Sequence, residues 1–204
     1  LPEYKNIFDL YLKDSTTEPT QLSSKTGDDS TSEFSLGEAV FYQNGTWAWT
    51  DLQKAGMKAD SLGMLPIYIG VKGEEKQGLA TGSENYWCIN SKASDADKKA
   101  TKDFLKWVVT SKTGIKSLSS DMGFTTPFKS FSDVKSDNPL VQAAVEDQNS
   151  GKTAVSWNFT MMPSEEWKNK LGSALLEYAQ GTGDWNAVKK AFVDGWKTEY
   201  DAVH

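Results

Sequence analysis

The sequence predicts an α/β fold that is rich in helices and has few short strands. Apolar residues recur at helical spacing in several stretches, which are separated by Gly, Pro and Asn. Three short apolar runs with strand character stand between these stretches. The chain has 204 residues, 38% hydrophobic and 25% charged, which is the composition of a globular protein with a sizeable core. Together these observations favour the α/β class.

The N-terminal part is expected to form two helices separated by a polar loop. Residues 3–13 have their apolar positions at helical spacing. Residues 14–31 are almost wholly polar, which is typical of a solvated loop. Ser32 is a suitable N-cap for a second helix. That helix would end at Asn44-Gly45, because both residues tolerate a left-handed backbone.

The middle of the chain predicts two strands followed by two helices. Ser94 and Asp97 have the spacing of a capping box at the start of the first helix. Cys88 lies in an apolar run and is expected to be a small buried residue of a strand, while Trp107 is expected in the core. The expected elements are strands over 62–69 and 85–90, a Gly- and Lys-rich turn over 70–78, and helices over 94–110 and 115–122.

The last third of the chain predicts mainly helices. Ser164 would cap a long helix that Gly181 ends, and Trp196 would lie in the core from the helix that follows. The expected elements are a helix over 138–148, a strand-like run over 154–159, and amphipathic helices over 164–180 and 184–203.

Composition excludes several classes of function. The net charge is −6 and the 22 basic residues are all lysine, which argues against nucleic acid and against phosphorylated or acidic solutes. The single histidine, His204, and the single cysteine, Cys88, exclude a Ser–His or Cys–His catalytic couple on a stable element and Cys/His zinc sites. No cofactor is expected, since the sequence has no P-loop, GxGxxG or EF-hand pattern.

Aromatic residues are the most prominent feature of the sequence. There are eight tryptophans, seven tyrosines and nine phenylalanines, and several tryptophans stand near turns beside polar residues. A flat aromatic face packs against the apolar face of a sugar ring, and neighbouring Asn, Asp, Glu and Lys side chains can bond its hydroxyls. The alternative is that these large rings simply fill the core. The 28 acidic residues show no facing pair that would indicate a glycosidase.

Several segments, taken in order, resemble the maltose-binding-protein-like family, the extracytoplasmic solute-binding proteins of carbohydrate ABC transporters. Residues 34–41 (FSLGEAVF) followed by Asn44-Gly45-Thr46-Trp47 resemble the family's "F-x-x-G-x-A-A-M" helix and its "N-G-x-W" motif. The further matches are Gly63-Met64-Leu65-Pro66, Ile89-Asn90, the helix with Ala100, Phe104-Leu105 and Trp107, then Thr110-Ser111 and Gly114, and finally Pro163 to Gly181.

The resemblance implies part of a two-lobe, type II periplasmic-binding-protein fold. Family chains run to nearly twice this length, so the chain is expected to be the C-terminal half of a longer parent protein. The signal peptide and the lipid-anchoring cysteine are expected in the missing part of that parent protein. Residues 1–65 and 126–204 would form the C-terminal lobe, and 66–125 an excursion into an incomplete N-terminal lobe. An exposed strand edge there would favour self-association.

The resemblance also implies a ligand site. Trp47 and Trp167 match tryptophans that stack on sugar in family members, and Trp49 would pack behind Trp47. No catalytic residue and no metal ligand are expected. The other expected ligand-binding residues are Glu84, Asn85, Tyr86 and Trp87 on a loop that faces the ligand, and Trp157 and Asn158 just before the late helix.

The expected function is non-catalytic binding of an oligosaccharide outside the cell membrane, with lobe closure and delivery to a membrane permease. One alternative is a fragment of a glycoside hydrolase, which would turn its ligand over. The other is a protein-interaction module, whose tryptophan emission would be uniformly blue and insensitive to sugars.

Overall fold

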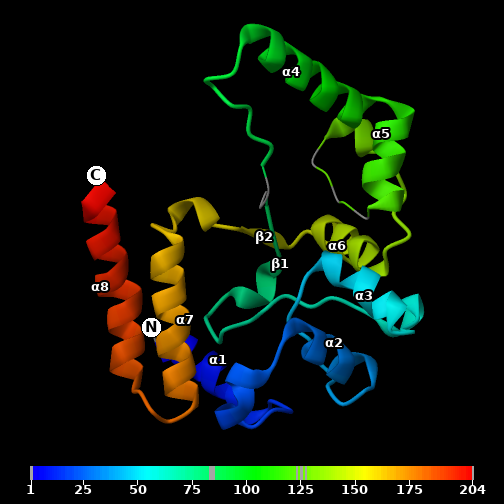
Figure 1. Cartoon of the computed structure of the whole chain (residues 1–204). Helices are drawn as coiled ribbons and strands as arrows, with labels where there is room; N and C mark the ends of the chain where they lie inside the picture. Colours follow the sequence, from blue (N-terminus) through cyan, green and yellow to red (C-terminus); the bar gives the residue numbers. More distant parts are fainter. Residues whose placement is uncertain (1, 83–85, 123, 125, 127, 204) are drawn as a thin grey trace. The chain divides into compact units, whose positions relative to one another are not determined.

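The structure is a computed structural model, and it describes residues 2–82, 86–122, 124, 126 and 128–203. The predicted α/β class, rich in helices with few strands, is confirmed (Figure 1). Strands β1 (Gln77–Thr81) and β2 (Thr153–Ser156) pair in a two-stranded sheet. The α-helices are α1 (Pro2–Lys13), α2 (Gly27–Ser35), α3 (Trp49–Lys54), α4 (Asp95–Thr110), α5 (Lys112–Lys116), α6 (Pro139–Asn149), α7 (Glu165–Ala179) and α8 (Trp185–Val203).

Shorter helical turns connect these elements. The 3₁₀ turns are η1 (Pro19–Ser24), η2 (Thr46–Ala48), η3 (Ala59–Ser61), η4 (Glu74–Lys76), η6 (Lys129–Phe131) and η7 (Phe159–Met161). A π-helical turn, η5 (Ser117–Asp121), continues α5, so the helix predicted over 115–122 is confirmed with an earlier start.

Backbone contacts divide the chain into two compact units. Unit 1 comprises Leu1–Tyr42, Ile67–Lys76 and Ser156–His204, and unit 2 comprises Gln43–Pro66 and Gln77–Val155. The division into 1–65 with 126–204 and an excursion over 66–125 was drawn for the lobes of a complete two-lobe protein. It stays a prediction.

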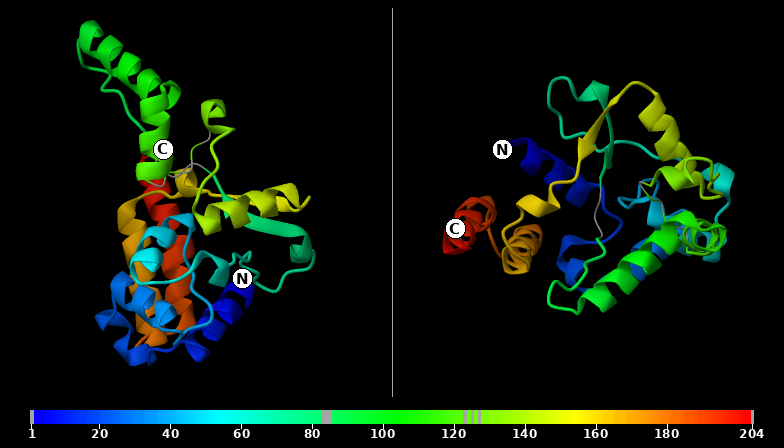
Figure 2. Two further views of the ribbon diagram at one scale, coloured as in Figure 1. Left: turned by 90° about the vertical axis from the view of Figure 1, so that its right-hand side faces the viewer. Right: turned by 90° about the horizontal axis from the view of Figure 1, so that it is seen from above.

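Unit 1 contains an antiparallel pair of helices, α7 and α8, which lie side by side in all three views (Figures 1 and 2). Ser164 caps α7 as predicted, because its hydroxyl oxygen accepts the Trp167 N–H at 2.9 Å. Gly181 follows the last turn with φ of +75°, a conformation that glycine adopts without steric cost. The two predicted helices are therefore confirmed.

Three aromatic rings join α1 to this pair. The Tyr178 and Trp185 rings meet edge to face with centroids 5.1 Å apart, and Phe8 of α1 lies 6.1 Å from Tyr178 and 6.3 Å from Trp185. The Tyr178 hydroxyl donates to the Asp9 carboxylate at 2.6 Å. The helix predicted over 3–13 is thus present and docked by its aromatic face.

Helix α2 differs from the prediction at both ends. Thr26, not Ser32, is the N-cap: its hydroxyl accepts the Asp29 N–H, and the Asp29 carboxylate accepts the Thr26 N–H at 2.7 Å. Gly37, with φ of +78°, ends the helix in a Schellman motif in which the Glu38 N–H bonds the Glu33 carbonyl at 2.9 Å. The helix predicted from Ser32 to residue 43 is therefore wrong beyond residue 35, and part of the predicted 14–31 loop is helical.

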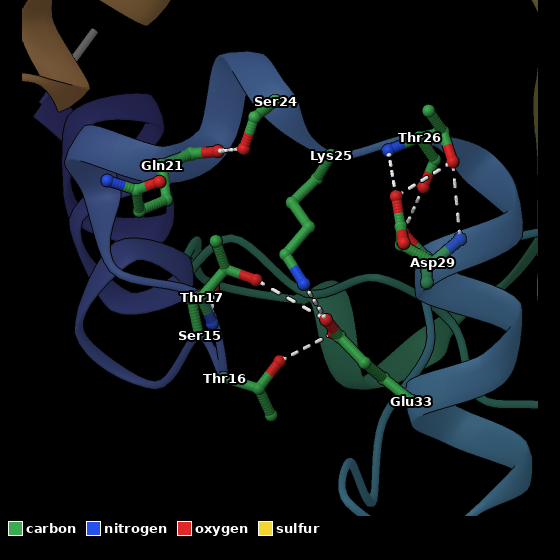
Figure 3. A network of polar contacts seen from close by, with 10 residues as sticks. Ser15, Thr16, Thr17, Gln21, Ser24, Lys25, Thr26, Asp29 and Glu33 are labelled. Carbon is green, nitrogen blue, oxygen red and sulfur yellow. Dashed lines mark hydrogen bonds and ion pairs between the residues drawn. The ribbon is translucent and has the colours of Figure 1, made fainter.

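The polar segment before α2 is held by one carboxylate (Figure 3). Glu33 accepts the Thr16 hydroxyl at 2.7 Å and the Lys25 ammonium at 2.9 Å. These hydrogen bonds connect residues on both sides of η1 to α2. Side-chain bonds of this kind, rather than apolar burial, give the segment its structure.

Unit 2 is built around α6 and the turn η2. The Asn138 side chain caps α6 by accepting the Leu140 N–H at 2.9 Å, and its amide donates to the Thr46 carbonyl at 2.8 Å. Asn138 itself is buried. The buried apolar residues of this unit are Ala48, Trp49, Leu52, Leu79, Leu118, Phe131, Leu140 and Val141.

The strands of unit 2 correct the sequence prediction. Among the described residues, neither 62–69 nor 86–90 forms a strand, and β1 occupies part of the predicted turn. A side chain of α6 also bonds β1: the Asp147 carboxylate accepts the Leu79 N–H at 2.7 Å. A Cβ at Gly78 would lie 2.6 Å from that carboxylate, so glycine permits the approach. The strand-like run predicted over 154–159 is confirmed in its first part, which belongs to β2 (Thr153–Ser156).

The helix predicted over 94–110 is confirmed as α4, with the Ser94 hydroxyl accepting the Asp97 N–H at 3.1 Å. Two burial predictions are wrong. Cys88 is exposed, because its segment is not a strand and lies outside the core. Trp107 is 49% exposed, and its ring pairs instead with the exposed ring of Phe104 on the same helix.

Candidate ligand-binding site

Trp47 stands in unit 2 as an exposed ring on a fixed turn. Its side chain is 58% exposed, although Ala48 and Trp49 beside it are buried. The ring lies over Gly45, where an added Cβ would be only 2.2 Å from the Cζ3 atom of Trp47. The Asn-Gly-x-Trp spacing therefore has a steric reason: glycine leaves the space in which the indole rests.

Two side-chain hydrogen bonds hold the turn that carries Trp47. The Asn44 side chain accepts the Gly45 N–H at 2.8 Å, and the Asn138 amide bonds the Thr46 carbonyl. Trp49, which the sequence placed behind Trp47, is buried. This arrangement presents the Trp47 indole to solvent on a backbone that several contacts hold in place.

The second predicted segment of unit 2 contributes Trp87 to an exposed aromatic pair. Trp87 is 54% exposed, and its ring lies nearly parallel to that of Phe128, with 16° between the planes and 6.4 Å between the centroids. Tyr86 is also exposed. The predicted residues Glu84 and Asn85 lie outside the described residues.

Unit 1 holds the remaining predicted residues in two different environments. The Trp157 ring, partly exposed, stacks on Phe159 with centroids 5.3 Å apart and 21° between the planes. Asn158 is exposed and begins η7, where its carbonyl accepts the Met161 N–H at 2.9 Å. This part of the prediction lies on the surface, where a ligand could reach it.

Trp167, by contrast, is buried between α7 and α8. It is 5% exposed, its ring meets that of Phe192 at 5.5 Å, and its indole N–H donates to the Phe192 carbonyl at 3.0 Å. Gly195 of α8 lies close enough that an added Cβ would sit 3.3 Å from the indole. In this structure the ring packs one helix against the other, and its contact with a sugar stays a prediction.

The charged groups near these residues form surface ion pairs. The Lys170 ammonium, 2.6 Å from Glu166, lowers the pKa of that carboxyl through hydrogen bonding and charge. Among the described residues, every carboxyl whose pKa departs clearly from its ordinary value departs downward. A glycosidase acid needs a raised pKa.

Two further findings concern metal ligands and membrane spans. Among the described residues, His, Cys, Asp and Glu side chains nowhere gather in threes as metal ligands would. Within the same part of the chain, every helix is too short or too polar to cross a bilayer.

An α/β fold that presents fixed, exposed aromatic rings is suited to binding small molecules. Residues 2–148 match the family model of the bacterial extracellular solute-binding proteins. Because this match spans well over half of the chain, the chain belongs to that family. A search of curated proteins finds no match.

Family membership establishes the general function. The chain is a non-catalytic, extracytoplasmic protein that binds a solute for transport. The resemblance inferred from the sequence is confirmed at this level, and the glycoside hydrolase alternative is excluded.

The sequence missed one aromatic residue of this surface, Phe128. It lies in a segment without helical or strand periodicity, far along the chain from Trp87. The only available signal was its aromatic character close to Phe131 in an otherwise polar stretch. Their pairing depends on tertiary structure, which a residue pattern does not reveal.

Proposed function

We propose that the solute is an oligosaccharide and that the chain delivers it to the membrane permease of an ABC transporter. The observation that carries this proposal is the exposed Trp47 indole held over Gly45. A free protein that keeps a large apolar ring in water on an anchored turn has a ready surface for the apolar face of a sugar.

The other proposed contacts are the exposed rings and polar groups of the predicted site. Tyr86, Trp87 and Trp157 would stack on further sugar rings, and Asn158, with Glu84 and Asn85, would bond hydroxyl groups. The absence of arginine supports a neutral sugar. Lipid anchoring of the parent protein belongs to the same proposal.

The test is a calorimetric titration of the chain with malto-, xylo-, manno- and cello-oligosaccharides. One class is expected to bind saturably. Covering a large apolar side chain stabilises by roughly 1.5–3 kcal/mol, so Trp47→Ala is expected to weaken binding by about tenfold to a hundredfold. Gly45→Ala is expected to weaken binding as well, because its methyl group displaces the ring while the tryptophan remains.

Trp107→Ala is the matched control. Trp107 is exposed to a similar degree in the same unit but is not part of the predicted site. Equal losses from Trp47→Ala and Trp107→Ala would overturn the role of Trp47. If no oligosaccharide binds, the proposal of a sugar ligand is wrong, and the exposed rings favour a protein partner instead.

A further inference from the structure

The aromatic pair formed by Trp87 and Phe128 has features that core packing does not explain. Both rings are exposed, Trp87 to 54% and Phe128 to 42%, and only 16° separates their planes. Tyr86, next in the chain, is exposed to an even greater degree. Aromatic rings that pack to stabilise a core are normally covered, so this surface needs another reason.

The position of Phe128 is fixed by contacts of its ring and of its backbone turn. Its ring lies 6.5 Å from that of Phe131, which is buried, and its carbonyl accepts the Phe131 N–H at 2.9 Å in the turn η6. Within the same turn, the Ser130 hydroxyl bonds the Val109 carbonyl of α4. Phe128 is therefore a ring on an anchored backbone, and its pairing with Trp87 defines the orientation of both planes.

The size of the surface favours a small ligand. The two paired side chains, of roughly 150–250 Å² each and about half exposed, offer about 200 Å². A standard protein interface buries about 800 Å² on each partner. The exposed area of this ring pair is closer in size to the C–H face of a pyranose ring than to a protein interface.

We infer that Trp87 and Phe128 together form one aromatic platform that takes the apolar face of a sugar ring, with Phe128 as a ligand contact. This inference rests on the proposed function and adds to it a residue that the family resemblance did not assign.

The experiment uses the full chain labelled with 5-fluorotryptophan, so that each of the eight tryptophans gives a fluorine resonance. Trp87→Phe assigns the Trp87 signal by its disappearance. Maltotriose, xylotriose, mannotriose and cellotriose are then added in turn. The trisaccharide that binds by calorimetry is expected to shift the Trp87 resonance in the wild-type chain. This measurement tests the aromatic pair without a substitution at Phe128.

Affinity measurements test Phe128 itself. An aromatic contact is worth about 0.5–1.5 kcal/mol, so Phe128→Leu is expected to weaken binding by about twofold to tenfold, and Phe128→Tyr is expected to retain it. Phe104→Leu is the matched control, because Phe104 and Trp107 form a similar exposed pair, 6.0 Å apart and 25° between planes, on α4.

The outcomes separate the inference from the proposed function. Binding of a trisaccharide without a shift at Trp87, or with equal affinity for the wild type and a folded Phe128→Leu, overturns the platform but leaves sugar binding intact. Absence of binding to every trisaccharide and longer oligosaccharide overturns the proposed function and the platform together.

Discussion

Trp47 and Trp167 occupy opposite environments although the same family resemblance singled out both. The Trp47 ring rests on Gly45 and is open to solvent, whereas the Trp167 ring is buried against Phe192. The difference arises from their elements: Trp47 lies in a short surface turn, and Trp167 lies in the first turn of a helix that packs against α8. Whether Trp167 contacts a sugar stays a prediction, and its structural role can be tested separately.

Replacing Trp167 is expected to destabilise unit 1. Trp167→Ala should lower the free energy of unfolding by about 3–5 kcal/mol, because it opens a cavity and removes the hydrogen bond from the indole to the Phe192 carbonyl. Trp167→Phe should lower it less, since a ring remains. Urea denaturation followed by circular dichroism measures both, and an unchanged Trp167→Ala midpoint with weakened sugar binding would contradict the packing role and favour a contact with the ligand.

Single residues were predicted well where a local rule governs them. Ser94, Ser164 and Gly181 define helix ends through bonds to residues a few positions away, and the structure confirms all three. Cys88 and Trp107 were predicted wrongly because burial depends on neighbours that are distant in sequence. Apolar character alone does not distinguish a core residue from an exposed one.

At the scale of elements, helices followed the sequence more closely than strands. α4, α6, α7 and α8 have local caps and continuous apolar stripes, so their bounds could be predicted. Strand β1 depends on a carboxylate of α6 that lies far along the chain, and its glycine-containing sequence resembles a turn. The polar segment before α2 likewise depends on Glu33, a single residue whose bonds no periodicity predicts.

The Glu33 network makes the stability of this segment dependent on pH. The Thr16 hydroxyl and the Lys25 ammonium lower the pKa of Glu33 below its ordinary value of about 4.3. A lowered pKa means that the anion stabilises the folded state above that ordinary value, and that this stabilisation is lost as pH falls through the lowered pKa.

The expected result concerns Glu33→Gln. The difference in free energy of unfolding between wild type and Glu33→Gln should be constant above about pH 5 and should shrink below about pH 4. Denaturant titrations at several pH values measure it, and Glu18→Gln is the control, because Glu18 lies in the same polar segment and its side chain makes none of the Glu33 bonds. A difference that stays constant down to about pH 2 would show that the Glu33 bonds do not stabilise the fold.

At the scale of the whole molecule, the sequence indicated the class of protein more securely than its internal division. Ordered motifs along the chain indicated a solute-binding protein, and the family match confirms this. The division into lobes stays a prediction, because short local patterns do not encode which segments associate. Phe128, likewise, became a candidate only through its tertiary contact with Trp87.

The overall charge leads to a last prediction, on ligand selectivity. A chain of net charge −6 without arginine repels anions and lacks the planar guanidinium that best binds carboxylates and phosphates. Among oligosaccharides of one backbone, the neutral form should therefore bind more tightly than a form that contains a uronic acid. Calorimetry of both at about 0.01 M and 0.15 M salt measures the preference, which should narrow at the higher salt because mobile ions screen the repulsion. Tighter binding of the acidic form at low salt would show that local lysines, and not the net charge, determine selectivity.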